Sequence, residues 1–279
     1  MTKLEEILSV TRERVARSRR EADLRALESA AAAHTPRGFR RRLLAMSQLG
    51  PAVIAELKKA SPSKGLLRNP FPVADLAVQL ARGGASALSV LTDEQFFQGS
   101  LGNLCQASSA TELPCLRKDF IVDDFQVLEA RANHADAILL ILSALDDETF
   151  RRLLERARSM DLDVLCEVHD QQELQRALEG GGDIIGVNSR DLRTFQVNLN
   201  TVLELSTLIP NHVLRVAESG IASGTEIKDL HSFGYQAFLI GEALMRAEDP
   251  GRKLEQLLQE AGWYSQSATA SSSWRGTVQ

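Results

Sequence analysis

Eight short apolar segments, separated by stretches of helical character, constrain the fold of this 279-residue chain most strongly. They begin at Val53, Ala87, Cys115, Ala137, Val164, Ile184, Val213 and Ala237, and they read VIAELK, ALSVLTD, CLRKDF, AILLILS, VLCEVHD, IIGVNSR, VLRVAES and AFLIGEA. Their starts are roughly 20 to 35 residues apart, the space that a strand, a helix and two short loops require. Intervening segments such as DDETFRRLLERARSM carry apolar residues at the helical spacing. We therefore expect eight βα units that close into a (β/α)8 TIM barrel, with an eight-stranded doubly wound sheet as the alternative.

The two ends of the chain lie outside these units. Residues 1–50 are arginine-rich with helical character, as in TRERVARSRREADLRALESAAAAH, and predict an N-terminal helical extension that packs on the barrel. The barrel is expected over residues 51–262. Residues 263–279 include SQSATASSSWRGTVQ, which has no periodicity and predicts a disordered tail.

The composition narrows the function classes. With 44% hydrophobic and 25% charged residues the chain is typical of a globular protein, and its net charge of −5 argues against nucleic acid or an anionic membrane as a partner. The start MTKLEEILSV lacks the features of a signal peptide, and no run approaches the about 18 apolar residues of a membrane span. Cys105, Cys115 and Cys166 form no CxxC pair, so neither a disulfide framework nor a zinc site is indicated. We expect a cytoplasmic protein.

Charged residues gather where several predicted strands end. Because side chains alternate along a strand, Glu56 and Lys58 stand above Ile54 at the barrel mouth if Ile54 packs inside, and Lys59 lies outside the mouth. The same alternation directs four further pairs inward: Leu116 with Lys118, Leu165 with Glu167, Asn188 with Arg190, and Val216 with Glu218. A mouth with three carboxylates and two lysines suits general acid and base catalysis, because neighbouring charges push pKa values apart.

The last two strands are followed by loops suited to phosphate. Ser219 and Gly220 follow the seventh strand and Gly241 follows the eighth, the two loops that often hold phosphate in this fold. Glycine lets backbone N–H groups approach an anion closely. Ser61 in the first loop would add a hydroxyl group.

The segment VIAELKKASPSKG, which starts at Val53, resembles the signature of the indole-3-glycerol phosphate synthase family. Further matching segments follow in order: LTDEQFFQGS, LRKDFIVDDFQ, CEVHDQQEL, GVNSRDL, AESGI and LIGEALMR. The resemblance extends to about residue 260 and implies a carboxy-lyase of tryptophan biosynthesis, acting on 1-(2-carboxyphenylamino)-1-deoxyribulose 5-phosphate. It implies a small-molecule partner, no metal and no organic cofactor, and it is compatible with a monomer.

The resemblance also implies roles for the charged residues of the mouth. Lys118 matches the general acid that protonates the ketose carbonyl, and Glu167 matches a carboxylate that transfers protons during rearomatisation and dehydration. Glu56 and Lys58 match a first-strand pair, in which Lys58 holds the substrate carboxylate or phosphate or serves as a second acid. Ring closure needs a proton donor, and we expect two neighbouring lysines to lower the pKa of that donor.

The remaining implied contacts concern substrate binding. Asn188 and Glu218 match residues that position the sugar hydroxyls and the lysines, and Arg190 would steer the anthranilate carboxylate. Ser61, Ser219, Gly220 and Gly241 match phosphate contacts. The aromatic ring would be enclosed by Phe97, Phe120, Leu139 and Leu192.

Three residues near the site are given other interpretations. The carboxylate of Glu242 would repel a phosphate, so its side chain is expected to point away. Cys166 has the parity that faces the helices and is expected to pack there, and His169 is expected at a helix start or in a loop.

Two alternative functions differ from the synthase in testable ways. Phosphoribosylanthranilate isomerase, a neighbouring phosphosugar barrel, uses a first-strand cysteine and a sixth-strand aspartate, where this chain has Glu56 and Asn188. A non-catalytic phosphosugar-binding module would lose Lys118 or Glu167 before its phosphate loops, yet both are present.

Overall fold

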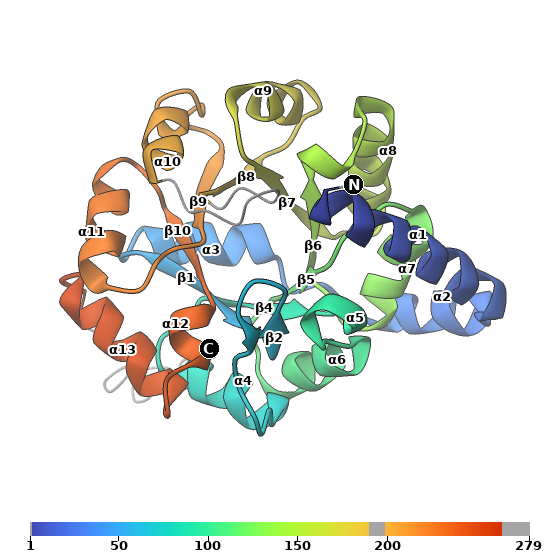
Figure 1. The fold of residues 1–279 in the computed structure, drawn as a ribbon, viewed down its shortest axis with the longest axis horizontal. Helices are drawn as coiled ribbons and strands as arrows, with labels where there is room; N and C mark the ends of the chain where they lie inside the picture. The colour runs from blue at the N-terminus through green and yellow to red at the C-terminus, as the bar shows by residue number, and fades with distance from the viewer. Residues whose placement is uncertain (1, 190–198, 264–279) are drawn as a thin grey trace, which may run out of the picture.

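The computed structural model describes residues 2–189 and 199–263, and its centre is a closed barrel of eight parallel strands (Figure 1). In barrel order these are β1 (Ala52–Leu57), β10 (Ala237–Ile240), β9 (Leu214–Glu218), β8 (Ile184–Asn188), β7 (Asp163–Val168), β6 (Ala137–Ile141), β5 (Cys115–Lys118) and β4 (Ala87–Leu91). Each strand falls on one predicted apolar segment. The TIM barrel is therefore confirmed, and the doubly wound alternative is wrong because the sheet closes.

Helices surround the barrel, and all but the last two lie between successive strands (Figure 1). They are α4 (Val73–Arg82), α5 (Glu94–Phe97), α6 (Leu101–Ala110), α7 (Asp124–Ala132), η1 (Leu142–Ala144), α8 (Asp147–Arg158), α9 (Gln171–Glu179), α10 (Leu199–Ser206), α11 (Gly224–Ser232), α12 (Glu242–Met245) and α13 (Pro250–Glu260). Several start where a short polar side chain caps free backbone N–H groups, as Asp146 does for α8 and Ser223 for α11. No helix among the described residues is long and apolar enough to cross a membrane.

The strand interiors show the predicted alternation. Ile54, Leu116, Leu165 and Val216 are fully buried in the core inside the barrel. Their neighbours in sequence, such as Val53 and Cys166, belong to the separate core between the strands and the helices. The parity used to direct side chains into the mouth is therefore correct.

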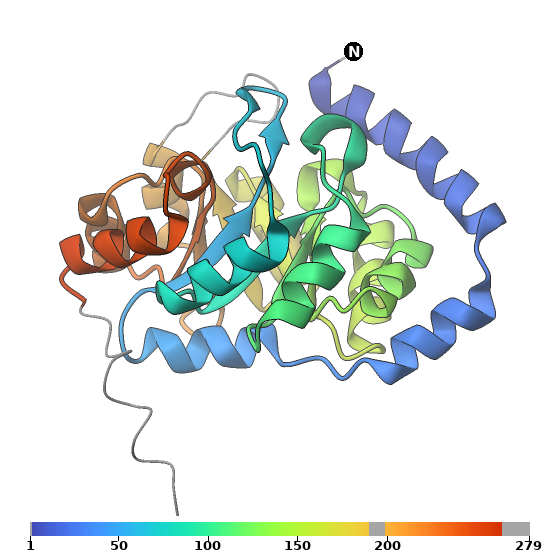
Figure 2. The same ribbon diagram turned by 90° about the horizontal axis from the view of Figure 1, so that it is seen from below.

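The N-terminal segment folds into α1 (Lys3–Glu21), α2 (Leu24–Ala33) and α3 (Phe39–Ser47), which run along the outside of the barrel from one end to the other (Figure 2). Phe39 and Leu43 of α3 are fully buried and share the inner core with Ala52 at the start of β1, so α3 closes the barrel end opposite the mouth. Ile7 of α1 shares the same core with Phe120 near the mouth.

A small hairpin interrupts the loop after β1. Strands β2 (Ala60–Ser61) and β3 (Gly65–Leu66) pair antiparallel, and Gly65 at φ +65° supplies the left-handed conformation that this tight turn needs. This hairpin was not predicted from the sequence. It places Ser61 beside the barrel mouth.

Candidate active site

A cavity of about 430 Å³ opens at the barrel mouth, where the carboxyl ends of the strands meet. The structure brings these predicted site residues together around it: Glu56, Lys58, Ser61, Phe97, Lys118, Phe120, Leu139, Glu167, Asn188, Glu218, Ser219, Gly220 and Gly241. Arg190 and Leu192 lie outside the described residues. Lys59 does not contribute to the cavity wall, as its parity predicted.

Lys118 lies between two buried carboxylates. Its Nζ is 2.9 Å from Glu167 Oε2 at the end of β7 and 3.6 Å from Glu218 Oε2 at the end of β9. Lys58 makes a similar pair with Glu56 on β1, at 2.5 Å from Nζ to Oε1. Both lysines are partly exposed to the cavity whereas the three carboxylates are nearly inaccessible. The positive groups are therefore the ones presented to a substrate.

These contacts shift the pKa values of Glu167 and Glu218 in opposite directions. Burial would raise the pKa of Glu167, but Lys118 and His169 hold it well below its usual range. Burial raises the pKa of Glu218 to about 8; the attraction of Lys118 opposes this shift, and repulsion from Glu167 and Glu56 adds to it. One carboxylate is thus kept ionised and the other holds a proton near neutral pH, the separation that distinguishes a base from an acid.

The expectation that neighbouring lysines lower the pKa of Lys118 is wrong. Burial does favour the neutral amine, but the attraction of Glu167, Glu218 and Glu56 outweighs it and raises the pKa of Lys118. Carboxylates from other strand ends surround the ammonium group, so the cationic form of Lys118 is the stable one. Lys118 therefore enters the reaction with its proton.

Two glycines leave room for two of these carboxylates. A Cβ atom on Gly186, which faces inward on β8, would overlap Glu218 Oε1, and one on Gly241 would lie 2.5 Å from Glu56 Oε1. Gly241 thus has a packing role in addition to the close anion approach that was predicted. Larger residues at either position would displace a carboxylate of the mouth.

The loop after β9 has an unusual backbone conformation. Ser219 at φ +66° and Gly220 at φ +75° both lie in the left-handed region, which is rare for a residue other than glycine. Ser189 fixes this loop, because its single hydroxyl hydrogen is shared between the carbonyl oxygens of Glu218 and Ser219, each 3.1 Å from Oγ. Ser189 was not predicted, although it directly follows the inward Asn188.

Glu242 is one of the residues that line the cavity, and the expectation that its side chain points away from a bound phosphate stays a prediction. Arg246, one helical turn later, lies 3.1 Å from its Oε1, and Lys64 lies 3.9 Å from the same atom. Both cations reduce the repulsion that Glu242 would exert on a phosphate. Arg246 was not predicted, and its only signal is the i, i+4 spacing from Glu242.

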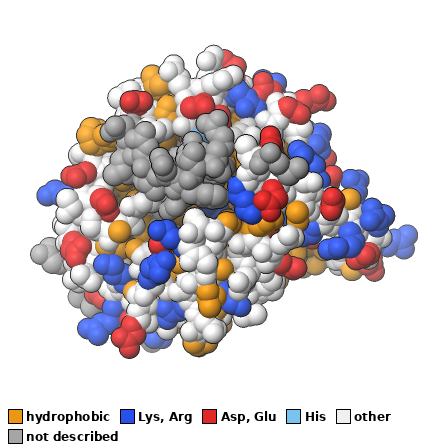
Figure 3. Space-filling model, in the orientation of Figure 1, with side chains coloured by type: hydrophobic (Ala, Val, Ile, Leu, Met, Phe, Trp, Pro, Cys, Tyr) orange, Lys and Arg blue, Asp and Glu red, His pale blue; other side chains and the backbone are white. Residues whose placement is uncertain are grey.

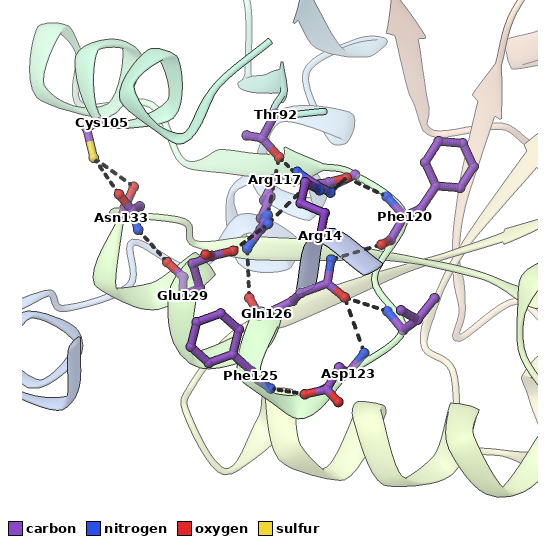
Figure 4. A network of polar contacts seen from close by, with 12 residues as sticks. Arg14, Thr92, Cys105, Arg117, Phe120, Asp123, Phe125, Gln126, Glu129 and Asn133 are labelled. Atoms are coloured by element: carbon purple, nitrogen blue, oxygen red, sulfur yellow. Dashed lines mark hydrogen bonds and ion pairs between the residues drawn. The ribbon is translucent and has the colours of Figure 1, made fainter. Parts of the chain in front are cut away.

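A buried polar network surrounds Arg117 on the side of β5 that faces the helices (Figure 4). The Arg117 guanidinium is 1% exposed and contacts Asp119 at 3.0 Å and Glu129 at 2.8 Å. Asp119 also accepts hydrogen bonds from Thr92 and from Arg14 of α1. Arg14 of the N-terminal extension and Arg117 of β5 therefore share Asp119, the residue that follows Lys118 in the chain.

His169 contacts the site, which its interpretation as a helix-start or loop residue did not include. Its Nε2 lies 3.4 Å from Glu167 Oε1. The available signal was its parity, because a residue two positions after Glu167 faces the same side of the strand. Among the described residues, no group of three His, Cys, Asp or Glu side chains is placed to hold a metal ion.

Comparisons with solved structures agree with the fold. Tryptophan synthase subunit alpha from Legionella pneumophila matches with a TM-score of 0.60 at 13% identity, over 82% of this chain and 99% of its own. KGPDC from Streptococcus mutans matches with a TM-score of 0.59 at 12% identity, over 76% of this chain and 97% of its own. At such low identity these matches support the barrel fold alone.

Sequence relatives give the family. A family model described as indole-3-glycerol phosphate synthase matches residues 4–257. Proteins named indole-3-glycerol phosphate synthase from Koribacter versatilis and Burkholderia multivorans are 54% and 49% identical to this chain over 255 residues. Each match covers 91% of this chain and 98% of the relative. The chain therefore belongs to the indole-3-glycerol phosphate synthase family.

Proposed function

We propose that this protein converts 1-(2-carboxyphenylamino)-1-deoxyribulose 5-phosphate into indole-3-glycerol phosphate, carbon dioxide and water, as a carboxy-lyase of tryptophan biosynthesis. The observation that carries the proposal is the Lys118 ammonium, 2.9 Å from the carboxylate of Glu167 in the barrel mouth. This pair supplies a proton donor and a proton acceptor side by side. The reaction needs both at neighbouring atoms of one substrate.

Ring closure is the step assigned to Lys118. The ring carbon that carries the carboxylate attacks the ketose carbonyl carbon, and the carbonyl oxygen takes the proton of Lys118 as its π electrons move onto it. The developing alkoxide is a stronger base than an amine, so transfer proceeds although the pKa of Lys118 is raised. Before transfer, the cation already stabilises the negative charge on that oxygen.

Decarboxylation follows from the position of the aromatic ring. The bond from the ring carbon to the carboxylate breaks, and its electron pair restores the aromatic system, so this step needs no electron sink from outside the substrate. Phe97 and Phe120, with ring centroids 6.4 Å apart, line the cavity with Leu139 and offer an apolar surface to the ring. Moving the carboxylate out of water favours its loss as carbon dioxide.

Dehydration is assigned to Glu167. The hydroxyl group formed in the first step leaves as water with a second proton, and Glu167 takes the proton lost from the adjacent carbon. Glu167 then returns this proton to Lys118, 2.9 Å away, which restores the starting state. The second proton on the departing water comes from solvent through another acid of the site, so each turnover consumes one proton.

Lys58 is assigned either to anion binding or to the second acid, and kinetics separates the two roles. A rise in KM for Lys58→Ala with kcat unchanged assigns anion binding, because only ground-state binding is then lost. A fall in kcat assigns the acid. Glu56 holds the Lys58 ammonium in either role.

The phosphate is assigned to the edge of the cavity formed by the loops after β9 and β10. Backbone N–H groups of the loop at Gly220 and of the turn at Gly241, with the hydroxyl groups of Ser61 and Ser219, would bind it. Arg246 lies at the same edge and adds a positive charge. Asn188 and Glu218 would contact the sugar hydroxyls between the phosphate and the ring.

We also propose a cytoplasmic monomer that needs no metal or organic cofactor and has no nucleic-acid or membrane partner. The net charge of −5 argues against a nucleic-acid or anionic-membrane partner, and acidic and basic side chains are interspersed over the face shown in Figure 3. Burial raises the pKa of the Cys115 and Cys166 thiols to about 12, so both stay protonated. Light scattering at several protein concentrations tests the monomer, and a dimer mass would contradict it.

The activity is tested with the pure protein and the synthetic substrate. Indole fluorescence should rise with time, with and without a metal chelator. Lys118→Ala, checked for folding by circular dichroism, is the matched control and should be slow. If folded wild-type protein gives no signal, the proposed function is wrong.

A further inference from the structure

His169 occupies a place directly behind the base assigned to the reaction. It follows the end of β7, and its parity points the imidazole to the same side as Glu167. Its side chain is only 14% exposed, and Nε2 lies 3.4 Å from Glu167 Oε1. The other oxygen of that carboxylate, Oε2, is the one that accepts the Lys118 hydrogen bond. Glu167 is thus contacted on both oxygens.

Glu173 fixes the orientation of the imidazole. It lies in the first turn of α9, and its Oε2 is 2.8 Å from the backbone N of His169 and 3.0 Å from Nδ1. The backbone N–H must donate, and a carboxylate can only accept, so Nδ1 carries a hydrogen. The start of α9 also favours a negative group at this place.

The remaining nitrogen decides the charge of the ring. Nε2 is buried, and no hydrogen-bond partner is aligned with it, although Glu167 Oε1 is within ion-pair distance. In the neutral ring a lone pair on Nε2 would face a carboxylate, and the two would repel each other. In the protonated ring Nε2–H faces that carboxylate and attracts it. The geometry therefore favours the imidazolium form.

We infer that His169, held by Glu173, is a positioning residue that remains an imidazolium and keeps Glu167 ionised and aimed at Lys118. The inference rests on the proposed function, because Glu167 is the group that it serves. His169 does not touch the substrate in this account. Its effect is exerted through the orientation and the proton affinity of Glu167.

The charges that surround His169 agree with this assignment. Among the described residues, the groups that face the ring are Glu167 from β7 and Glu173 from α9, while β6, β8 and η1, which lie beside β7, carry no titratable side chain. Burial would lower the pKa of His169, but these two carboxylates raise it to about 10. Both neighbours thus act in the same direction.

The charge is measured without any assay of activity. The chain has five histidines, and comparison with the spectrum of His169→Gln assigns the ring signals of His169 in NMR. These signals should keep the imidazolium shifts from pH 6 to above pH 8. A neutral ring at pH 7, or an ordinary titration near 6.5, overturns the inference whether or not the protein turns over substrate.

The effect on catalysis is measured by pH profiles of kcat. Glu173→Gln keeps an oxygen acceptor for both N–H groups of His169 but removes the negative charge, so the pKa of His169 should fall. We expect kcat near wild type at pH 6 and about tenfold or more below wild type at pH 9, because the ring has then lost its proton. Glu179→Gln, the same change at an exposed position of the same helix, should follow the wild-type profile.

His169→Gln should lower kcat about tenfold or more at all pH values and move the acidic limb of the profile to higher pH, since Glu167 loses a cation. A purely structural role would lower the amount of folded protein without moving either limb. If His169→Gln does not fold, the Glu173→Gln profile still decides. If the folded variants have kcat–pH profiles with the same acidic and basic limbs as wild type, the inference is wrong.

Discussion

Arg117→Ala and Lys118→Ala should affect different properties of the protein although the two residues are adjacent. Arg117 faces the helices and is 1% exposed, with its guanidinium within 3.0 Å of Asp119 and 2.8 Å of Glu129. It also donates to the carbonyl of Gln126 at 2.9 Å and to Thr92 at 3.2 Å. Truncation leaves the two carboxylates without their shared cation. Arg117→Ala is therefore expected to affect stability, and Lys118→Ala to affect turnover.

The size of the stability loss follows from the burial of the network. Removing one partner of a buried ion pair costs about 3 to 5 kcal/mol, because an uncompensated charge remains. Arg14 still reaches Asp119 at 3.0 Å, which places the expected loss toward the lower end. In a protein of this size, such a loss lowers the melting temperature by roughly 6 to 20 °C.

Thermal unfolding followed by circular dichroism measures this loss, with Arg117→Met as the control that keeps most of the side-chain volume. Both variants should melt well below wild type, and kcat per folded molecule should stay within about threefold of wild type. An unchanged melting temperature would refute the account of the network. A large fall in kcat without loss of stability would mean that the register of β5 is wrong by one residue.

Three further predictions test the mouth of the barrel. Gly220→Val should raise KM roughly 30-fold or more, because about 2 to 4 kcal/mol of binding free energy is lost. Inorganic phosphate should compete with the substrate in wild type. An unchanged KM in steady-state kinetics would place the phosphate elsewhere. Gly186→Ala should lower kcat about tenfold or more, because the new Cβ displaces Glu218, and a wild-type rate would refute this packing. The pKa of Glu218 is raised from 4.5 to about 8, so its contribution to stability is present below pH 4.5 and is lost as the pH rises through 8. Glu218→Gln should therefore gain stability relative to wild type between pH 5 and pH 9 in urea unfolding, and parallel pH curves would contradict the shift.

The strands and their inward faces could be predicted because both are local properties of the sequence. Short apolar runs at regular spacing define strands of a parallel sheet, and the period of two in side-chain direction then follows from covalent geometry. This was sufficient to place Glu56, Lys118, Glu167 and Glu218 in one mouth. The same alternation assigned Lys118 to the mouth and Arg117 to the opposite side of the strand, which faces the helices.

The charge states of the site could not be predicted because they depend on distances between different strands. The sequence shows two lysines in the mouth, but only the closed barrel shows that the carboxylates of Glu167 and Glu218 lie within ion-pair distance of Lys118. The contact from His169 to Glu167 likewise depends on Glu173, which folds back from the first turn of α9. The β2–β3 hairpin was missed because its two-residue strands carry no periodic signal.

The kcat of Lys118→Ala on 1-(2-carboxyphenylamino)-1-deoxyribulose 5-phosphate tests the central claim most directly. Removal of the proposed general acid should lower kcat by about 10²- to 10⁴-fold, with a modest change in KM, because the proposed phosphate and ring contacts are assigned to other residues that line the cavity. A folded Lys118→Ala protein that retains the wild-type kcat would contradict the assignment of ring closure to Lys118.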